Sequence, residues 1–250
     1  MVDIHTHLLP NIDDGAREYE EALEVIKLAE NTGFTDLFVT PHYIAGHFNN
    51  DKVLVDMMTK KLNEYLEDKD VHLNIYNGSE VYVCENLDKL VDENVIPTLN
   101  NSKYILIEIP MNMKIMYLDD IIYKLTTMGL VPILAHPERY SYVQNDPNFL
   151  LELIQKNVLI QSNYGSLIGQ YGKTAEKTLE KLLKNNMVHF LSTDTHGQGY
   201  VYENMPKILS ILNKIVDKKT VNLLTKENGE MVIHNKDIEI IEPTRIKKFF

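Results

Sequence analysis

The stretch "KYILIEIPMNMKIMYLDDIIYKLTTMGLVPILAHPE" (residues 103–138) contains two short apolar segments separated by a helical pattern. "KYILIEIP" (103–110) predicts a buried strand, and "LVPILAHPE" (130–138) predicts another. Between them, "YLDDIIYKLTTMG" (117–129) predicts a helix that ends at its glycine. Units of strand, helix and strand are typical of parallel sheets.

The same alternation runs through most of the chain. Further strands are predicted at residues 2–5, 34–40, 71–77, 158–163 and 188–194, and helices at 18–33, 50–69, 147–156, 169–186 and 204–216. About seven strands separated by helices favour a parallel α/β sheet, and seven or eight such units can close into a barrel. No Pro/Gly/Ser-rich linker, repeat or low-complexity tract marks a boundary. We therefore expect one domain over 1–225, with a C-terminal extension over 226–250 whose packing is left open.

Composition excludes several classes of protein. The formal net charge of −11 argues against a nucleic-acid-binding surface and disfavours anionic membranes. No apolar stretch approaches the roughly 20 residues that span a bilayer, and the N-terminus lacks the pattern of a signal peptide. The single cysteine, Cys84, cannot form an internal disulfide. These features predict a cytoplasmic protein.

Histidine and carboxylate residues follow the predicted strands, or lie in their last positions. They comprise His5, His7, His42, Glu80, Glu108, His136, Asp194 and His196, together with the aspartates of "NIDDG" (11–15). Residues two apart in an extended segment project to the same side, so the His-x-His and Asp-x-His pairs each present two groups together. In a (β/α) barrel the carboxyl ends of the strands meet on one face, where catalytic groups gather.

This set of side chains predicts a metal site. Imidazole and carboxylate without thiolate suit zinc, manganese or iron, and count against a structural zinc site or an iron–sulfur cluster. Nine ligands exceed the needs of one ion, so a multinuclear site is indicated, of the kind that activates water and binds phosphoryl oxygens. Spacing alone does not decide which of Asp13 and Asp14 is a ligand, because Asp13 could instead orient a ligand or shape the turn before Gly15.

The order of motifs resembles the polymerase-and-histidinol-phosphatase (PHP) superfamily. The strings "DIHTHLLPNIDDG", "YILIEIP…VPILAHPERY" and "LIQSNYGSLIGQYGK…VHFLSTDTHG" resemble the CpsB/CapC/YwqE family in particular, over residues 2–198. Members of that family are bacterial manganese-dependent protein-tyrosine phosphatases encoded with capsule or exopolysaccharide genes. The resemblance implies a distorted (β/α)7 barrel of the PHP type.

The resemblance also implies three divalent metal ions, Mn²⁺ in the first place, with Fe or Zn as alternatives. One ion would take His5, His7, Glu80 and Asp194; a second would share Glu80 and add Glu108 and His136; the third would take Asp14, His42 and His196. Family resemblance alone selects Asp14 over Asp13.

The function implied is metal-assisted hydrolysis of a phosphomonoester. Arg139 would bind the phosphate through its bidentate guanidinium, and Arg139, His42, Asp194 and His196 form the expected catalytic set. The implied partner is a phosphotyrosine protein, the tyrosine-rich tail of a membrane-associated bacterial tyrosine kinase. Two alternatives remain open: another PHP phosphoesterase, acting on histidinol phosphate or a nucleotide, and a catalytically weak metal-binding regulatory module.

Two positions depart from the family pattern. After Asp-x-His the family places another arginine, whereas here "GQGYVYENMP" follows and Lys207 is the first basic residue. Some members form rings through Glu-Glu-x-x-x-Arg on the first helix, but here Glu20 and Glu21 are followed by Val25 at the arginine position, so that ring is not predicted. A cysteine-dependent phosphatase is excluded, because Cys84 has Leu90 where the Cys-x5-Arg loop requires arginine.

Overall fold

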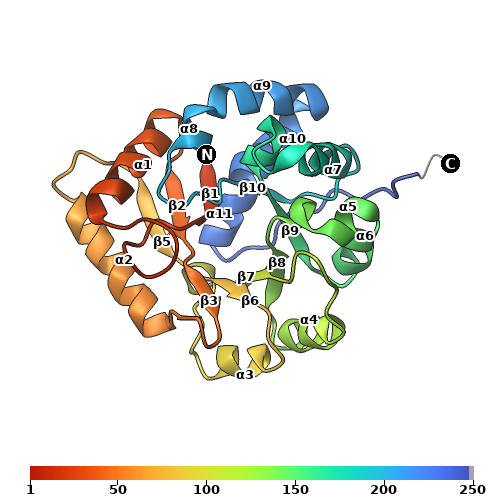
Figure 1. Ribbon diagram of the computed structural model, residues 1–250, viewed down its shortest axis with the longest axis horizontal. Helices are drawn as coiled ribbons and strands as arrows, with labels where there is room; N and C mark the ends of the chain where they lie inside the picture. Colours follow the sequence, from red (N-terminus) through yellow and green to blue (C-terminus); the bar gives the residue numbers. More distant parts are fainter. Residues whose placement is uncertain (248–250) are drawn as a thin grey trace.

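Parallel strands form a barrel with helices around it in the computed structural model, which describes residues 1–247 (Figure 1). The strands are β1 (Val2–Thr6), β2 (Asp36–Val39), β3 (His42–Ile44), β4 (Phe48–Asn49), β5 (Asn74–Asn77), β6 (Glu80–Tyr82), β7 (Tyr104–Glu108), β8 (Val131–Leu134), β9 (Leu159–Asn163) and β10 (Phe190–Ser192). Hydrogen bonding joins them in two sheets, ordered β1-β2-β5 and β10-β9-β8-β7-β6-β3-β4. All of these pairings are parallel except the short β3–β4 hairpin.

Two barrel positions are each occupied by a pair of consecutive strands. β2 runs into β3, and β5 runs into β6, so that β2 pairs with β5 and β3 pairs with β6. Pro41 separates the first pair, because proline has no N–H for the ladder; Gly78 and Ser79 separate the second. The predicted strands at 34–40 and 71–77 therefore stop short of β3 and β6, which the sequence reading missed. With these pairs counted once and β4 set aside, the predicted seven-stranded barrel is confirmed.

The barrel closes where β1 meets β10. The amide of Asp194 donates to the carbonyl of His5 at 3.0 Å, and the amide of His7 donates to the carbonyl of Thr195 at 2.9 Å. Asp3 reinforces this seam: its buried carboxylate accepts hydrogen bonds from the Thr193 amide (3.2 and 3.3 Å). These contacts place the first and last predicted ligand pairs side by side.

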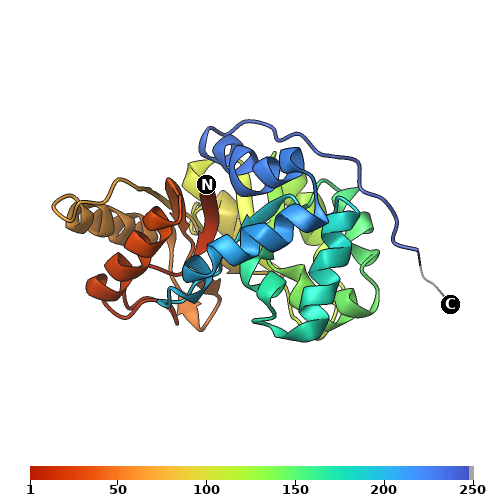
Figure 2. The same cartoon turned by 90° about the horizontal axis from the view of Figure 1, so that it is seen from above.

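Helices cover the outside of the barrel (Figures 1 and 2). They are α1 (Tyr19–Asn31), α2 (Lys52–Leu66), α3 (Leu87–Asp92), α4 (Leu118–Thr127), α5 (Ser141–Asn145), α6 (Phe149–Ile154), α7 (Gly172–Lys184), α8 (Tyr200–Glu203), α9 (Met205–Ile215), α10 (Lys218–Asn222) and α11 (Asn228–Ile233). Gly33 has φ of +91° just after α1, as its predicted capping role requires. Leucine, isoleucine and valine from the strands and the inner helix faces fill one large core between the two layers.

The C-terminal segment lies against the barrel. A π-helical turn, η4 (Leu223–Glu227), leads into α11, which contacts β1. Beyond it the chain runs extended along one side of the molecule (Figure 2), where the Thr244 amide donates to the Asn185 carbonyl and Ile246 exchanges two hydrogen bonds with Asn148. Residues 248–250 of the predicted extension lie outside the described residues. Within residues 1–247, no helix is both long enough and apolar enough to cross a membrane.

Candidate metal centre

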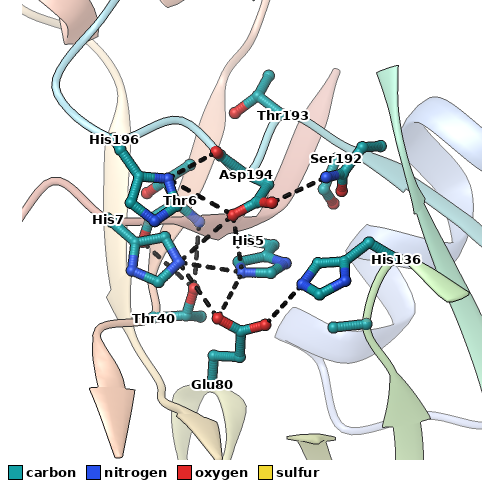
Figure 3. Close-up of polar contacts among 12 residues, drawn as sticks. His5, Thr6, His7, Thr40, Glu80, His136, Ser192, Thr193, Asp194 and His196 are labelled. Atoms are coloured by element: carbon teal, nitrogen blue, oxygen red, sulfur yellow. Dashed lines mark hydrogen bonds and ion pairs between the residues drawn. The ribbon is translucent and has the colours of Figure 1, made fainter. Parts of the chain in front are cut away.

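The structure brings all nine predicted ligands together at the carboxyl ends of the barrel strands. Figure 3 shows His5, His7, Glu80, His136, Asp194 and His196 turned toward one another. Residues from 5 to 196 thus contribute to one cluster. Three overlapping groups have ligand atoms within 4.8 Å of one another: His7, Asp14, His42 and His196; His5, His7 and Glu80; and His42, Glu80 and Glu108. Asp194 lies 3.4 Å from His5, and His136 lies 2.9 Å from Glu80.

His5 and His7 face each other through their Nε2 atoms, which are 3.1 Å apart. Each ring uses its Nδ1 elsewhere, His5 with Oε1 of Gln161 at 3.0 Å and His7 with Oδ2 of Asp13 at 2.8 Å. Because these oxygens are acceptors, each Nδ1 carries a proton, and the two Nε2 atoms are directed at the same place. A metal ion between the two rings could be bound by both Nε2 atoms.

Glu80 lies at the centre of the cluster and is fully buried. Its Oε2 is 3.3 Å from His5 Nε2, 3.4 Å from His7 Nε2 and 3.0 Å from His42 Nδ1. Nevertheless Glu80 Oε2 and His42 Nδ1 have no hydrogen-bond partner among the described residues, and both atoms are buried. Close, buried donor atoms without hydrogen-bond geometry are what a metal ion would satisfy.

Asp14 and His196 lie at the more open side of the cluster. Oδ1 of Asp14 is 3.5 Å from Nε2 of both His42 and His196. The Asp14 side chain is 58% exposed and that of His196 is 33% exposed, whereas Glu80 is 1% exposed. A ligand could therefore approach the cluster from this side.

The electrostatics of the cluster favour positive charge at its centre. Burial lowers the pKa of His5, but the carboxylates of Glu80 and Asp194 outweigh it and raise that pKa to about 9. Burial raises the pKa of Glu80, but His5, His136 and His42 outweigh it and hold that pKa well below its usual range. Burial and the charge of Glu80 raise the pKa of Glu108. The carboxylates thus attract a cation, whether a proton or a metal ion.

The loop of "NIDDG" separates the roles of its two aspartates. The Asp13 side chain is buried: Oδ2 accepts from His7 and from the His42 amide at 3.1 Å, and Oδ1 accepts from the Gly15 amide at 3.0 Å. Asp13 therefore orients His7, while Asp14 faces the other ligands. Gly15 is required here, because an added Cβ would lie 2.1 Å from the His7 carbonyl oxygen.

Two of the nine residues have left-handed backbone conformations. His136 has φ of +35° and Asp194 has φ of +53°. Both follow the ends of barrel strands, β8 and β10. Left-handed backbone at residues other than glycine is uncommon and concentrates at functional sites. The turns at these two positions send the side chains into the cluster (Figure 3).

Arg139 borders a pocket of about 260 Å³ beside the cluster, which we call the Arg139 pocket. It is lined by Arg139, Gln170, Tyr171, Asp194, Thr195, His196, Gln198, Tyr200 and Val201. Arg139 Nη1 donates to Asp194 Oδ2 at 2.9 Å, and its guanidinium carbon lies 4.3 Å from the centre of the Tyr171 ring. Arg139 is the only cationic side chain among these lining residues, and Lys207, which is exposed on α9, is not one of them.

The four histidines left out of the predicted site lie elsewhere. His47, His72 and His234 are exposed, and His189 is buried in the wall of the barrel. Cys84 is partly buried and free, and burial raises the pKa of its thiol.

Sequence reasoning missed the buried polar residues that surround the cluster, above all Asp3, Gln161 and Asn163. Asp3 stands near the start of the first predicted strand, and Gln161 and Asn163 lie at the end of another. The polarity of these residues within apolar strands is the one signal that the sequence offers for them.

Comparison with known proteins identifies the family. The model of the capsular polysaccharide synthesis family CpsB/CapC matches residues 1–234. The chain belongs to the CpsB/CapC family. The resemblance carried by its motifs is thereby confirmed, as is the α/β barrel of a single domain.

Relatives in the CpsB/CapC family align over almost their whole length. CapC of Staphylococcus aureus is 32% identical over 100% of this chain and 99% of its own. Tyrosine-protein phosphatase YwqE of Bacillus subtilis is 30% identical over 99% of this chain and 97% of its own. The solved structures of YwqE and of CpsB from Streptococcus pneumoniae are described as metal-dependent tyrosine phosphatases. The matching chain superposes with a TM-score of 0.93 at 30% identity, covering 99% of this chain and 100% of its own.

A more distant likeness concerns the fold alone. Histidinol phosphate phosphatase of Lactococcus lactis superposes with a TM-score of 0.54 at 12% identity, over 85% of this chain and 94% of its own. The barrel is thus shared with proteins of other activities.

Proposed function

We propose that this chain is a metal-dependent protein-tyrosine phosphatase that acts in capsule or exopolysaccharide synthesis. The observation that carries the proposal is the full-length similarity to relatives named tyrosine-protein phosphatases, in a chain whose nine predicted ligands lie within one cluster. The intact ligand set argues against a module that has lost its chemistry.

The cluster would hold three divalent ions, which we propose to be Mn²⁺. The first would be held by His5, His7, Glu80 and Asp194, the second by Glu80, Glu108 and His136, and the third by Asp14, His42 and His196. The facing Nε2 atoms of His5 and His7 support the first assignment. The equal 3.5 Å separations of Asp14 from His42 and His196 support the third.

Bound divalent ions would supply Lewis-acid chemistry, lowering the pKa of water and neutralising charge on phosphoryl oxygens. The protein's own contribution begins with Arg139, whose planar guanidinium suits two oxygens of a phosphate. His196 and His42 lie at the open side of the cluster, where a phosphate group would arrive. The phenol leaving group has a pKa of about 10, so it departs with less protonation than an alkoxide requires.

Substrate would bind in the Arg139 pocket. Tyr171 stacks against the guanidinium on one side, and Asp194 holds Nη1 on the other, so the position of Arg139 is defined before substrate enters. The second arginine of the family pattern has no cationic replacement among the lining residues, where Gln198 and Tyr200 stand instead. We infer that Arg139 provides the main charged contact with phosphate.

The physiological substrate we propose is a phosphotyrosine protein, the tyrosine-rich tail of a membrane-associated bacterial tyrosine kinase. Val25 is 2% exposed within α1, so an arginine of the ring-forming motif is replaced by a core residue. We therefore propose no ring assembly through this helix.

A comparison of substrates tests the proposed function. Purified protein loaded with Mn²⁺ should hydrolyse a phosphotyrosine peptide with much higher kcat/KM than histidinol phosphate or a nucleoside monophosphate. A strong preference for either small phosphate would assign the chain to another phosphoesterase activity. Bound metal without hydrolysis of any of the three would favour a metal-binding regulatory module.

A further inference from the structure

Strand β9 ends beside the cluster but contributes none of its nine residues. Instead, two side chains of β9 join two of the predicted ligands. Oε1 of Gln161 lies 3.0 Å from Nδ1 of His5, Nε2 of Gln161 donates to Oδ1 of Asn163 at 2.9 Å, and Nδ2 of Asn163 donates to Oδ2 of Asp194 at 2.8 Å. All four side chains are buried. We call Gln161 and Asn163 the amide relay.

The chemistry of Asp194 fixes the direction of every hydrogen bond in the relay. Oδ2 of Asp194, which faces Asn163, also lies 2.9 Å from Nη1 of Arg139; because a guanidinium can only donate, this oxygen is an acceptor. Asn163 must then turn its NH₂ group toward Asp194 and its oxygen toward Gln161. Gln161 in turn donates to Asn163 and presents its oxygen to His5. His5 must donate from Nδ1, which leaves Nε2 directed at the cluster.

The strand geometry keeps the relay in register. Gln161 and Asn163 are two residues apart on β9, so their side chains project from the same face of the sheet, where Gln161 contacts His5 and Asn163 contacts Asp194. The backbone N–H of Asn163 donates at 2.9 Å to Oε1 of Glu138, which also accepts from the Ser166 hydroxyl at 2.7 Å. Burying a side-chain amide costs free energy unless it is hydrogen-bonded. The hydrogen bonds of Gln161 and Asn163 are all made only when His5 and Asp194 both take part.

We propose that Gln161 and Asn163 are positioning residues that hold His5 with its proton on Nδ1 and fix the orientation of the Asp194 carboxylate. The relay thereby prepares two ligands from opposite ends of the chain to bind the same ion. The proposal rests on the metal centre of the proposed function, and adds to it residues that touch neither metal nor substrate. Partners of this kind typically change metal affinity by about 10–100-fold.

The test compares Gln161→Met with Ser162→Ala. Methionine matches glutamine in length but neither accepts from His5 nor donates to Asn163. Ser162 is the adjacent buried residue on β9, its side chain projects to the opposite face, and its Oγ has no hydrogen-bond partner among the described residues. Mn²⁺ affinity would be measured by titration calorimetry. We expect Gln161→Met to weaken binding by about 10–100-fold and Ser162→Ala to leave it unchanged.

A spectroscopic measurement separates positioning from general support of the fold. In protein loaded with Zn²⁺ and labelled with ¹⁵N-histidine, the Nδ1 proton of His5 should show the downfield shift of a hydrogen-bonded ring N–H. Gln161→Met should lose that shift, and Gln161→Glu should restore it, because a carboxylate still accepts from His5.

Unchanged Mn²⁺ affinity in Gln161→Met, or equal weakening in Ser162→Ala, would overturn the proposal. So would a Nδ1 proton whose shift is the same with methionine as with glutamine. If the wild type binds Mn²⁺ about 10–100-fold more tightly than Gln161→Met but does not hydrolyse phosphotyrosine, the proposed activity fails while the amide relay is supported.

Discussion

Replacement of His189 by asparagine should reveal a pH-dependent contribution to stability far from the cluster. His189 is buried just before β10, where its Nδ1 accepts a hydrogen bond from the backbone N–H of Ile160 at 3.0 Å. Its Nε2 has no partner among the described residues. Burial lowers the pKa of His189 to about 4. Asparagine can accept the same hydrogen bond through Oδ1 and does not titrate.

The sign of the effect follows from the two protonation states. In the unfolded chain His189 has the ordinary pKa of about 6.5. Between that pH and about pH 4, His189 is therefore protonated in the unfolded state and neutral in the folded state. The stability contributed by neutral His189 is therefore complete above about pH 6.5 and is lost as pH falls toward 4. The difference between the two pKa values corresponds to a loss of about 2 kcal/mol by about pH 5, rising to about 3 kcal/mol at lower pH.

Urea unfolding of wild type and His189→Asn at a series of pH values would measure this loss. The difference between the two free energies of unfolding removes every group that the proteins share, the metal ligands included. At about pH 7.5 the variant should be less stable because asparagine leaves part of the ring's volume empty. That deficit should shrink by about 2 kcal/mol on lowering the pH to about 5. A deficit that stays constant over this range would refute the reasoning.

Three further substitutions test the site. His136→Ala should lower kcat/KM for a phosphotyrosine peptide by at least about 100-fold, through loss of several kcal/mol of transition-state stabilisation. Its far-UV circular dichroism spectrum should be unchanged. Wild-type turnover in the fully metallated variant would mean that the site is misplaced. Tyr171→Leu should raise KM about 5-fold with little change in kcat, because about 1 kcal/mol of stacking on Arg139 is lost. Tyr171→Phe keeps the aromatic ring and should keep the wild-type KM. Equal effects of the two substitutions on KM would exclude stacking as the cause. Asp13→Asn should weaken Mn²⁺ binding by about 10-fold or more, because one amide oxygen cannot replace two carboxylate oxygens that accept from His7, Gly15 and His42. Unchanged Mn²⁺ affinity on calorimetric titration would show that Asp13 only shapes the loop.

Much of the barrel could be predicted because its strands are apolar runs between amphipathic helices. The strand prediction was wrong where strands are short and interrupted. Pro41 and Gly78 are turn signals in a sequence, yet here the chain continues as β3 and β6 after each of them. The pairing of His42 with Glu80 across β3 and β6 that results is tertiary, and local propensity carries no information about it.

The candidate ligands were visible because histidine and glutamate are rare at the ends of buried strands. Gln161 and Asn163 stand in an equivalent place, but amides bind metals poorly and gave no comparable signal. Their role becomes visible only when His5 and Asp194, which are 189 residues apart in sequence, are both within hydrogen-bond distance. Family resemblance selected Asp14 over Asp13, whereas the spacing of residues left the choice open. The structure supplies the physical reason, because the Asp13 carboxylate is buried against His7 and Asp14 faces His42.

The central claim is that the cluster binds metal ions that catalyse hydrolysis of phosphotyrosine. Its most direct test is a titration of chelator-treated protein with Mn²⁺, in which bound metal is counted by mass spectrometry and phosphotyrosine-peptide turnover is followed in the same samples. We predict that turnover is absent without metal and reaches its maximum at three ions per chain. Full turnover in the chelated protein, or three bound ions with no turnover, would contradict the account.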